Sequence, residues 1–190
     1  SLSAVNIPKI KGLNTYEGKY YHTGRWPKKK VDLKDQVVAQ IGTGSSGIQV
    51  APEIAKVVKK LVIFQRTPNY SIPARNKKLT KEIINNYLKN YKKIKKLIKK
   101  TPGGHTFSFP NRSVFDFNKI ERDKIFEKAW FKGSLAFRAC FGDITKNLKA
   151  NEKASNFIKE KILKIVKDKN KAKILTNFDH PFTSKRPTLN

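Results

Sequence analysis

The feature that most constrains the fold is a glycine-rich stretch between two short apolar runs. The first run, VVAQI at residues 37–41, leads directly into GTGSSG. The stretch SGIQVAPEIAKVV is typical of a helix, which Pro52 should kink or shorten, and LVIFQ at residues 61–65 forms the second run. Short β-branched apolar runs indicate buried parallel strands. Strand, turn, helix and strand within about thirty residues make a βαβ unit, so the sequence predicts an α/β fold with a Rossmann-like domain.

The turn itself matches the GxGxxG pattern of dinucleotide-binding sites. In such a turn Gly42 permits the tight bend, Gly44 lets a pyrophosphate approach the backbone, and Gly47 lets helix and strand pack closely. The helix, expected to begin at Ser45 or Ser46, would offer N–H groups and a positive dipole end to the phosphates. The alternative is a turn that binds nothing, but its place between strand and helix favours a nucleotide.

The end of the second strand indicates which dinucleotide is bound. An NAD site usually has Asp or Glu there to accept hydrogen bonds from the ribose 2′-OH. Here the residues are Gln65, Arg66 and Thr67. A guanidinium binds a 2′-phosphate through charge-assisted hydrogen bonds, whereas a carboxylate repels it. The sequence therefore predicts NADP rather than NAD, the alternative for Arg66 being an ordinary surface arginine.

The rest of the chain shows changes of character that predict its organisation. Residues 1–33, which are rich in Gly and Pro, are expected to form an ordered connector. The βαβ unit is expected over 34–76, a mainly helical insertion over 77–171, and a return to the NADP domain over 172–190. Within the insertion the apolar spacing predicts helices over 80–100, with Thr80 as N-cap, near 119–131, near 133–148 and over 152–168.

The charge of the chain is extreme, with 42 Lys and Arg against 14 Asp and Glu and a formal net charge of +28. Such an excess is compatible with a nucleic-acid or anionic-membrane partner, and residues 80–100 with a membrane-surface helix. Because the lysines are spread over many segments, a general lysine bias and a packed helix with a solvated lysine face are favoured. We expect no nucleic-acid partner, no metal site and no membrane span. The single cysteine, Cys140, fits a reducing compartment such as the cytoplasm.

The connector carries a second motif. Tyr16, Gly18, His22, Trp26 and Pro27 resemble the FxGxxxHxxxW fingerprint of Baeyer–Villiger monooxygenases, with Tyr at the leading Phe position. The later segments GTGSSGIQ, FQRTPNYSIPARN, TPGG and SKR resemble cyclohexanone- and phenylacetone-type monooxygenases in the same order. The resemblance extends along essentially the whole chain.

The resemblance implies roles for individual residues. The pyrophosphate loop and helix start would be Gly42, Thr43, Gly44, Ser45, Ser46, Gly47 and Gln49. Arg66, Thr67 and Lys185 would contact the 2′-phosphate, and Arg186 would be the active-site arginine beside flavin and nicotinamide. His22 and Trp26 would belong to the fingerprint that links the two nucleotide domains, although from the sequence alone His22 is rather a structural histidine in a turn.

The implied activity is an FAD- and NADPH-dependent insertion of oxygen from O₂ into a ketone, which gives an ester or lactone. The family's FAD-binding GxGxxG precedes the fingerprint, and this chain has one GxGxxG and no Met. We therefore expect an interior fragment of a two-dinucleotide-domain flavoprotein that lacks its FAD-binding domain and is inactive alone. Three alternatives stay open: an N- or S-oxygenating relative, a protein that works as an NADPH oxidase or reductase, and a basic nucleic-acid-binding module.

Overall fold

A computed structural model describes residues 4–101 and 103–190. Residues 1–3 and Pro102, which is part of the TPGG motif, lie outside the described residues. The chain divides into two units, Ser1–Gln65 and Arg66–Asn190. Both helices and strands are present, so that the chain is of the mixed helix-and-strand type.

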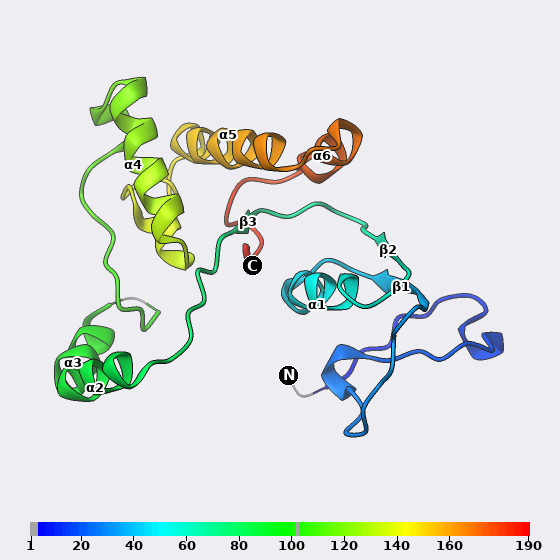
Figure 1. Ribbon diagram of the computed structural model, residues 1–190. Helices are drawn as coiled ribbons and strands as arrows, with labels where there is room; N and C mark the ends of the chain where they lie inside the picture. The colour runs from blue at the N-terminus through cyan, green and yellow to red at the C-terminus, as the bar shows by residue number, and fades with distance from the viewer. Residues whose placement is uncertain (1–3, 102) are drawn as a thin grey trace. The chain divides into compact units, whose positions relative to one another are not determined.

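The first unit contains the predicted strand, turn, helix and strand. Strand β1 (Val37–Ile41) pairs in parallel with β2 (Lys60–Phe64), and helix α1 (Ser45–Ala55) connects them (Figure 1). Pro52 lies inside α1, which ends three residues later. Before β1 the chain has two short 3-10 helices, η1 (Leu13–Thr15) and η2 (Thr23–Arg25). The predicted connector is therefore ordered by turns rather than by long elements.

The prediction that both strands are buried is wrong for the described structure. Val37 and Ile41 are each 66% exposed, and Phe64 is 57% exposed. A parallel strand is buried only when both faces of its sheet are covered. This sheet has two strands, and the side chains of β1 alternate between exposed and half-buried, so one face of β1 lacks cover.

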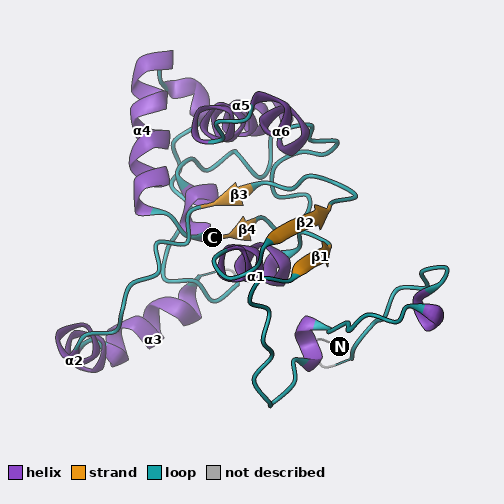
Figure 2. Ribbon diagram, turned by 45° about the vertical axis from the view of Figure 1, so that its right-hand side comes forward, coloured by secondary structure: helices purple, strands orange, loops and turns teal. Residues whose placement is uncertain are grey.

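The second unit is mainly helical. A short strand, β3 (Ser71–Ile72), pairs in parallel with β4 (Thr188–Leu189), as Figure 2 shows. Along the chain, the described helices of this unit come after β3 and before β4. They are α2 (Lys81–Lys89), α3 (Tyr91–Lys100), η3 (Val114–Asp116), α4 (Lys119–Lys132), η4 (Leu135–Ala139), α5 (Leu148–Ile165) and α6 (Lys169–Leu175). The strand pairing thus returns the end of the chain to the point where the helical segment begins.

The sequence predicted these helices unevenly. The helix expected near 119–131 is confirmed as α4, and the one expected over 152–168 as α5, which begins four residues earlier. The helix expected over 80–100 is interrupted at Asn90, although Thr80 caps it as predicted by accepting a hydrogen bond from the Ile83 N–H at 3.3 Å.

Two helix predictions are wrong. The helix expected near 133–148 is absent, because Gly133 and Ser134 both take positive φ and end α4. Only the five residues of η4 form helical turns there before α5 begins. In the tail, where loop and strand were expected from residue 172, α6 continues to Leu175.

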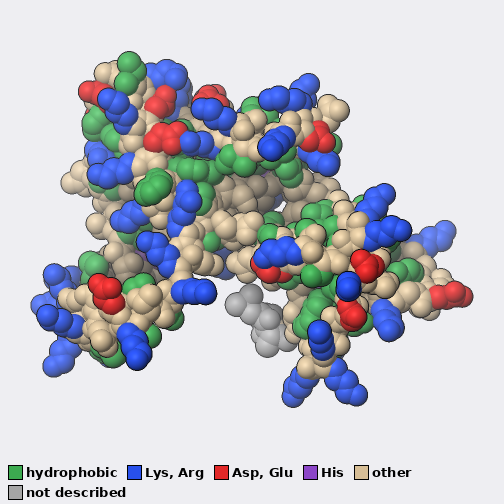
Figure 3. All heavy atoms as spheres, viewed as in Figure 1, with side chains coloured by type: hydrophobic (Ala, Val, Ile, Leu, Met, Phe, Trp, Pro, Cys, Tyr) green, Lys and Arg blue, Asp and Glu red, His purple; other side chains and the backbone are tan. Residues whose placement is uncertain are grey.

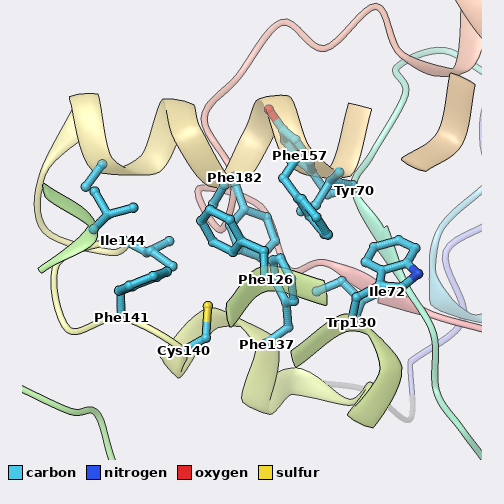
Figure 4. Packing of buried hydrophobic residues seen from close by; sticks show 14 residues of the cluster. Tyr70, Ile72, Phe126, Trp130, Phe137, Cys140, Phe141, Ile144, Phe157 and Phe182 are labelled. Carbon is cyan, nitrogen blue, oxygen red and sulfur yellow. The ribbon is translucent and has the colours of Figure 1, made fainter. Parts of the chain in front are cut away.

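An aromatic core holds the second unit together. Phe126 and Trp130 of α4, Phe137 of η4 and Phe157 of α5 are buried together (Figure 4). The rings of Phe126 and Phe157 are 5.1 Å apart. Each fully buried ring of this size contributes about 1.5–3 kcal/mol relative to an exposed one. Tyr70 and Phe182 extend into the same cluster, so the core anchors the segments just after Arg66–Thr67 and just before Lys185–Arg186.

The lysine-rich helices differ from the expected packed helix. Every residue of α2 is exposed, including the apolar Ile83 and Leu88, so the expectation of a packed apolar face is wrong for α2. In α3, Ile94 and Ile98 are half-buried. Lys and Arg side chains are spread over the visible face rather than gathered in one stripe (Figure 3). Within residues 4–101 and 103–190, no helix is both long and apolar enough to cross a membrane.

Candidate dinucleotide-binding site

The glycine-rich turn joins the end of β1 to the start of α1. Gly42 has a φ of +97°, a conformation that favours glycine. Its N–H donates to the Phe64 carbonyl at 2.9 Å, which fixes the turn to β2. The helix begins at Ser45, as predicted, and no side chain caps its N-terminus at Gly44. The turn therefore presents the uncapped positive end of α1, where backbone N–H groups attract anions.

The surroundings of Gly44 and Gly47 differ in the room that they leave for a side chain. A Cβ added to Gly47 would lie 2.5 Å from the Gly42 carbonyl oxygen, so packing within the chain excludes a side chain there. Gly44 has φ −69° and ψ −177°, which any residue adopts, and an added Cβ would meet nothing within 4 Å. As the N-cap of α1, Gly44 is also a better residue than alanine. The open space beside it leaves room for a ligand, such as a pyrophosphate, to approach the backbone.

Two glutamines brace the turn, and neither was predicted to have this role from the sequence. The Gln40 side-chain amide donates to the carbonyls of Gly42 and Gly47, at 2.9 and 3.1 Å. The Gln65 amide donates to the Thr43 hydroxyl at 3.0 Å. The available signal was the polar Gln40 within the apolar run VVAQI, since a buried amide needs hydrogen-bond partners. These three bonds hold the turn in place before any ligand binds.

The fingerprint lies beside the same helix. Trp26 and Thr23 line a hollow of about 420 Å³ together with Ser46, Gln49 and further residues of α1. The ring of Trp26 lies 5.6 Å from that of Tyr21, and both are partly exposed. The structure thus brings Trp26 together with two residues predicted at the pyrophosphate loop.

The other fingerprint residues shape the connector. His22 caps η2, because its Nδ1 accepts a hydrogen bond from the Gly24 N–H at 3.0 Å. This agrees with a histidine that orders a turn. Gly18 lies against the ring of Tyr16, so a Cβ there would collide with the ring. Pro27 follows Trp26, whose backbone is extended, and belongs to no helix or strand.

The second unit brings together two segments that carry the other predicted residues. The Asn69 side-chain amide donates to the Arg186 carbonyl at 2.9 Å, across 117 residues of sequence. The Thr188 N–H donates to the Tyr70 carbonyl at 2.9 Å and continues into the β3–β4 pairing. Arg66, Lys185 and Arg186 are exposed. The hydrogen bonds between these two segments therefore lie next to the predicted residues Arg66–Thr67 and Lys185–Arg186.

Lys185 lies close to a carboxylate that is itself bonded to a histidine. Its Nζ lies 3.5 Å from Asp179 Oδ1, and Asp179 Oδ1 lies 2.5 Å from the His180 ring nitrogen Nδ1. The hydrogen bond from His180, with a smaller contribution from the positive charge of Lys185, holds the pKa of the Asp179 carboxyl below its ordinary value. The carboxylate is thus charged at neutral pH and pairs with Lys185.

A buried amide fixes the same loop from the core. Asn151 of α5 accepts from the Phe182 N–H at 2.9 Å and donates to the Phe182 carbonyl at 2.7 Å. It also donates to the Ile144 carbonyl at 2.9 Å. Asn151 was not singled out in the sequence, because a helical asparagine carries no local signal for a partner 31 residues away.

Parallel strands joined by a helix, with a GxGxxG turn ahead of that helix, define a mixed α/β protein with a turn of the dinucleotide-binding type. No protein-family model matches the chain. It is 40% identical over 170 residues to cyclohexanone 1,2-monooxygenase of Acinetobacter sp, which covers 88% of the chain and 31% of the relative. The chain belongs to the family of Baeyer–Villiger-type flavin monooxygenases.

Two further comparisons agree. A Baeyer–Villiger monooxygenase of Pseudooceanicola batsensis is 38% identical over 189 residues, with 98% of the chain and 34% of the relative covered. The structure of an oxidized steroid monooxygenase bound to NADP matches with a TM-score of 0.90 and 37% identity, over 97% of the chain and 35% of that protein. The chain thus spans about a third of the length of the relatives it matches.

Proposed function

We propose that this chain is the NADP-binding part of an FAD- and NADPH-dependent monooxygenase that converts ketones to esters or lactones. The observation that carries the proposal is the open turn at Gly44, where no side chain caps α1 and an added Cβ would meet nothing within 4 Å. The names of similar structures support it, since several are described as complexes with FAD and NADP. We also propose that the protein works in the cytoplasm, where the lone Cys140 stays reduced.

In this proposal the turn holds the pyrophosphate of NADP. The backbone N–H groups of Ser45, Ser46 and Gly47 open α1 and would donate to phosphate oxygens. The hydroxyl of Thr43 and the amide of Gln49 would support the same group. Because Gln40 and Gln65 already brace the turn, little reorganisation is required on binding, which favours affinity.

The 2′-phosphate would be held by the second unit. Arg66 and Lys185 each supply a positive charge, and Thr67 supplies a hydroxyl donor. The hydrogen bond from Asn69 to the Arg186 carbonyl keeps the segment of Arg66 and Thr67 beside the segment of Lys185. The 2′-phosphate would add a partner for the exposed Arg66 and a second anion for Lys185, which already pairs with Asp179, so the arrangement favours NADPH over NADH.

Arg186 is the residue we assign to the reaction. When bound, NADPH and FAD supply the electrons and the activation of O₂, so that ketone, O₂, NADPH and a proton give ester, water and NADP⁺. The Arg186 guanidinium would stabilise negative charge that develops on the carbonyl oxygen of the ketone. Arginine keeps its proton throughout the physiological pH range, so it acts as a fixed charge and not as an acid.

The experiment is an Arg186→Ala substitution in the FAD-loaded enzyme, with cyclohexanone and ¹⁸O₂ as probes. We expect NADPH binding to persist while the labelled lactone is lost. Arg122→Ala, which removes an arginine from α4, is the matched control and should form lactone at the unaltered rate. Lactone formation by Arg186→Ala at the rate of the unaltered enzyme would exclude the assignment.

A further inference from the structure

Asn69 makes hydrogen bonds to three partners in two segments of the second unit. Its Nδ2 donates to the Arg186 carbonyl at 2.9 Å. Its Oδ1 accepts from the Tyr70 N–H at 2.9 Å and lies 3.3 Å from Nε2 of His180. Asn69 therefore connects the segment just after Thr67 directly to the loop that contains Lys185 and Arg186.

Both segments that Asn69 connects are anchored by buried aromatic residues. Tyr70 is 3% exposed, stacks on Phe178 at a centroid distance of 3.9 Å, and donates its hydroxyl to the His180 carbonyl at 2.9 Å. Phe182, at the start of the other segment, is 1% exposed. The frame that Asn69 bridges is thus rigid, and its amide is oriented by the Tyr70 backbone.

The Lys185–Arg186 loop needs such a restraint. Thr183 has a φ of +74°, which is strained for a β-branched residue. Ser184 stabilises the turn locally, since its N–H and hydroxyl both donate to the Pro181 carbonyl. Beyond that turn, the Asn69 bond holds the backbone at Arg186 itself.

We propose that Asn69 is a positioning residue that fixes the Lys185–Arg186 loop beside Arg66 and Thr67 and thereby sets the preference for NADPH over NADH. The inference rests on the proposed function, because it assumes that Lys185 and Arg66 contact the 2′-phosphate. Asn69 itself is not assigned a contact with the cofactor.

The test compares NADPH and NADH affinity of the chain by isothermal titration calorimetry. In Asn69→Ala we expect the Kd for NADPH to rise about five-fold, the factor that corresponds to one net hydrogen bond of about 1 kcal/mol. The Kd for NADH should change much less, because Lys185 would contact the 2′-phosphate, which NADH lacks. Amide hydrogen exchange of residues 184–188 should become faster, which is a readout independent of cofactor.

Two further variants keep the result interpretable. Asn69→Asp keeps the size of the side chain and the acceptor for the Tyr70 N–H, but it cannot donate to the Arg186 carbonyl, so it should lose selectivity as well. Asn90→Ala is the matched control. It removes an amide that donates to the Asn86 carbonyl at the same 2.9 Å, and it should leave both affinities and the exchange of residues 184–188 unchanged.

The outcomes separate the inference from the proposed function. If Arg66→Ala and Lys185→Ala lose the preference for NADPH while both Asn69 variants keep it, the inference is wrong and the proposed function stands. If Arg66→Ala and Lys185→Ala also keep the preference, the 2′-phosphate assignment fails and the inference fails with it. An equal fall of NADPH and NADH affinity in both Asn69 variants would indicate a merely structural role and would also overturn the inference.

Discussion

Replacing Gly44 by alanine should separate folding from cofactor binding. The added Cβ would meet no atom within 4 Å, and the backbone at φ −69° accepts alanine. Alanine is a poorer N-cap than glycine, which costs up to about 1 kcal/mol. Its lower conformational entropy in the unfolded chain contributes about 0.4–1 kcal/mol in the opposite direction. The free energy of unfolding should therefore change by less than about 1 kcal/mol.

Cofactor binding should respond strongly to the same change. A methyl group at Gly44 would occupy the space where a pyrophosphate reaches the backbone N–H groups of α1. Loss of one or two charge-assisted hydrogen bonds, each worth about 1.5–3 kcal/mol, raises the Kd for NADPH by about ten-fold or more. The assays are urea denaturation for stability and calorimetric titration for NADPH.

Gly47→Ala is the matched control for this experiment. Its Cβ would lie 2.5 Å from the Gly42 carbonyl oxygen, so that variant should be destabilised by about 1–3 kcal/mol. Stable folding of Gly44→Ala with NADPH affinity equal to that of the unaltered chain would refute the reasoning, because Gly44 would then have no role that a ligand explains.

Two other substitutions and one labelling experiment have definite expected results. Gln40→Leu leaves two turn carbonyls without their donor, and urea denaturation should show a loss of about 1–3 kcal/mol; an unchanged midpoint would contradict the bracing role. Asn151→Ala removes three hydrogen bonds to the backbone of Ile144 and Phe182. The free energy of unfolding should therefore fall by roughly 2–4 kcal/mol. A fall below about 0.5 kcal/mol would show that other contacts hold the loop. Burial raises the pKa of the Cys140 thiol to about 12, so the thiol stays protonated in the folded chain at about pH 8. Iodoacetamide should then label Cys140 slowly until urea unfolds the chain, and fast labelling of the folded chain would argue against its burial.

Local patterns explain why the first unit could be predicted. The apolar run, the glycine turn and the amphipathic stretch are all encoded within a few residues, and β1, α1 and β2 form as expected. The burial of the strands could not be predicted, because it depends on which elements cover the sheet. The same dependence on long-range contacts left α2 exposed where a packed face was expected.

The misses in the second unit have a similar cause. The predicted helix over 133–148 fails at Ser134, whose N–H donates to the Pro73 carbonyl at 2.8 Å, 61 residues earlier. Such a bond leaves no mark in the local sequence. For the same reason Asn69 and Asn151 escaped notice as residues that hold a loop. Lys185 and Arg186 were assigned through the family resemblance, since two basic residues carry little information in so basic a chain.

The most direct measurement is a calorimetric titration of the unaltered chain with NADPH and, separately, with NADH. A 2′-phosphate site built from Arg66, Thr67 and Lys185 predicts saturable binding of NADPH at a single site, with an affinity at least about ten-fold higher than for NADH. Equal affinity for the two cofactors, or no saturable binding of either, would contradict NADP binding by this chain.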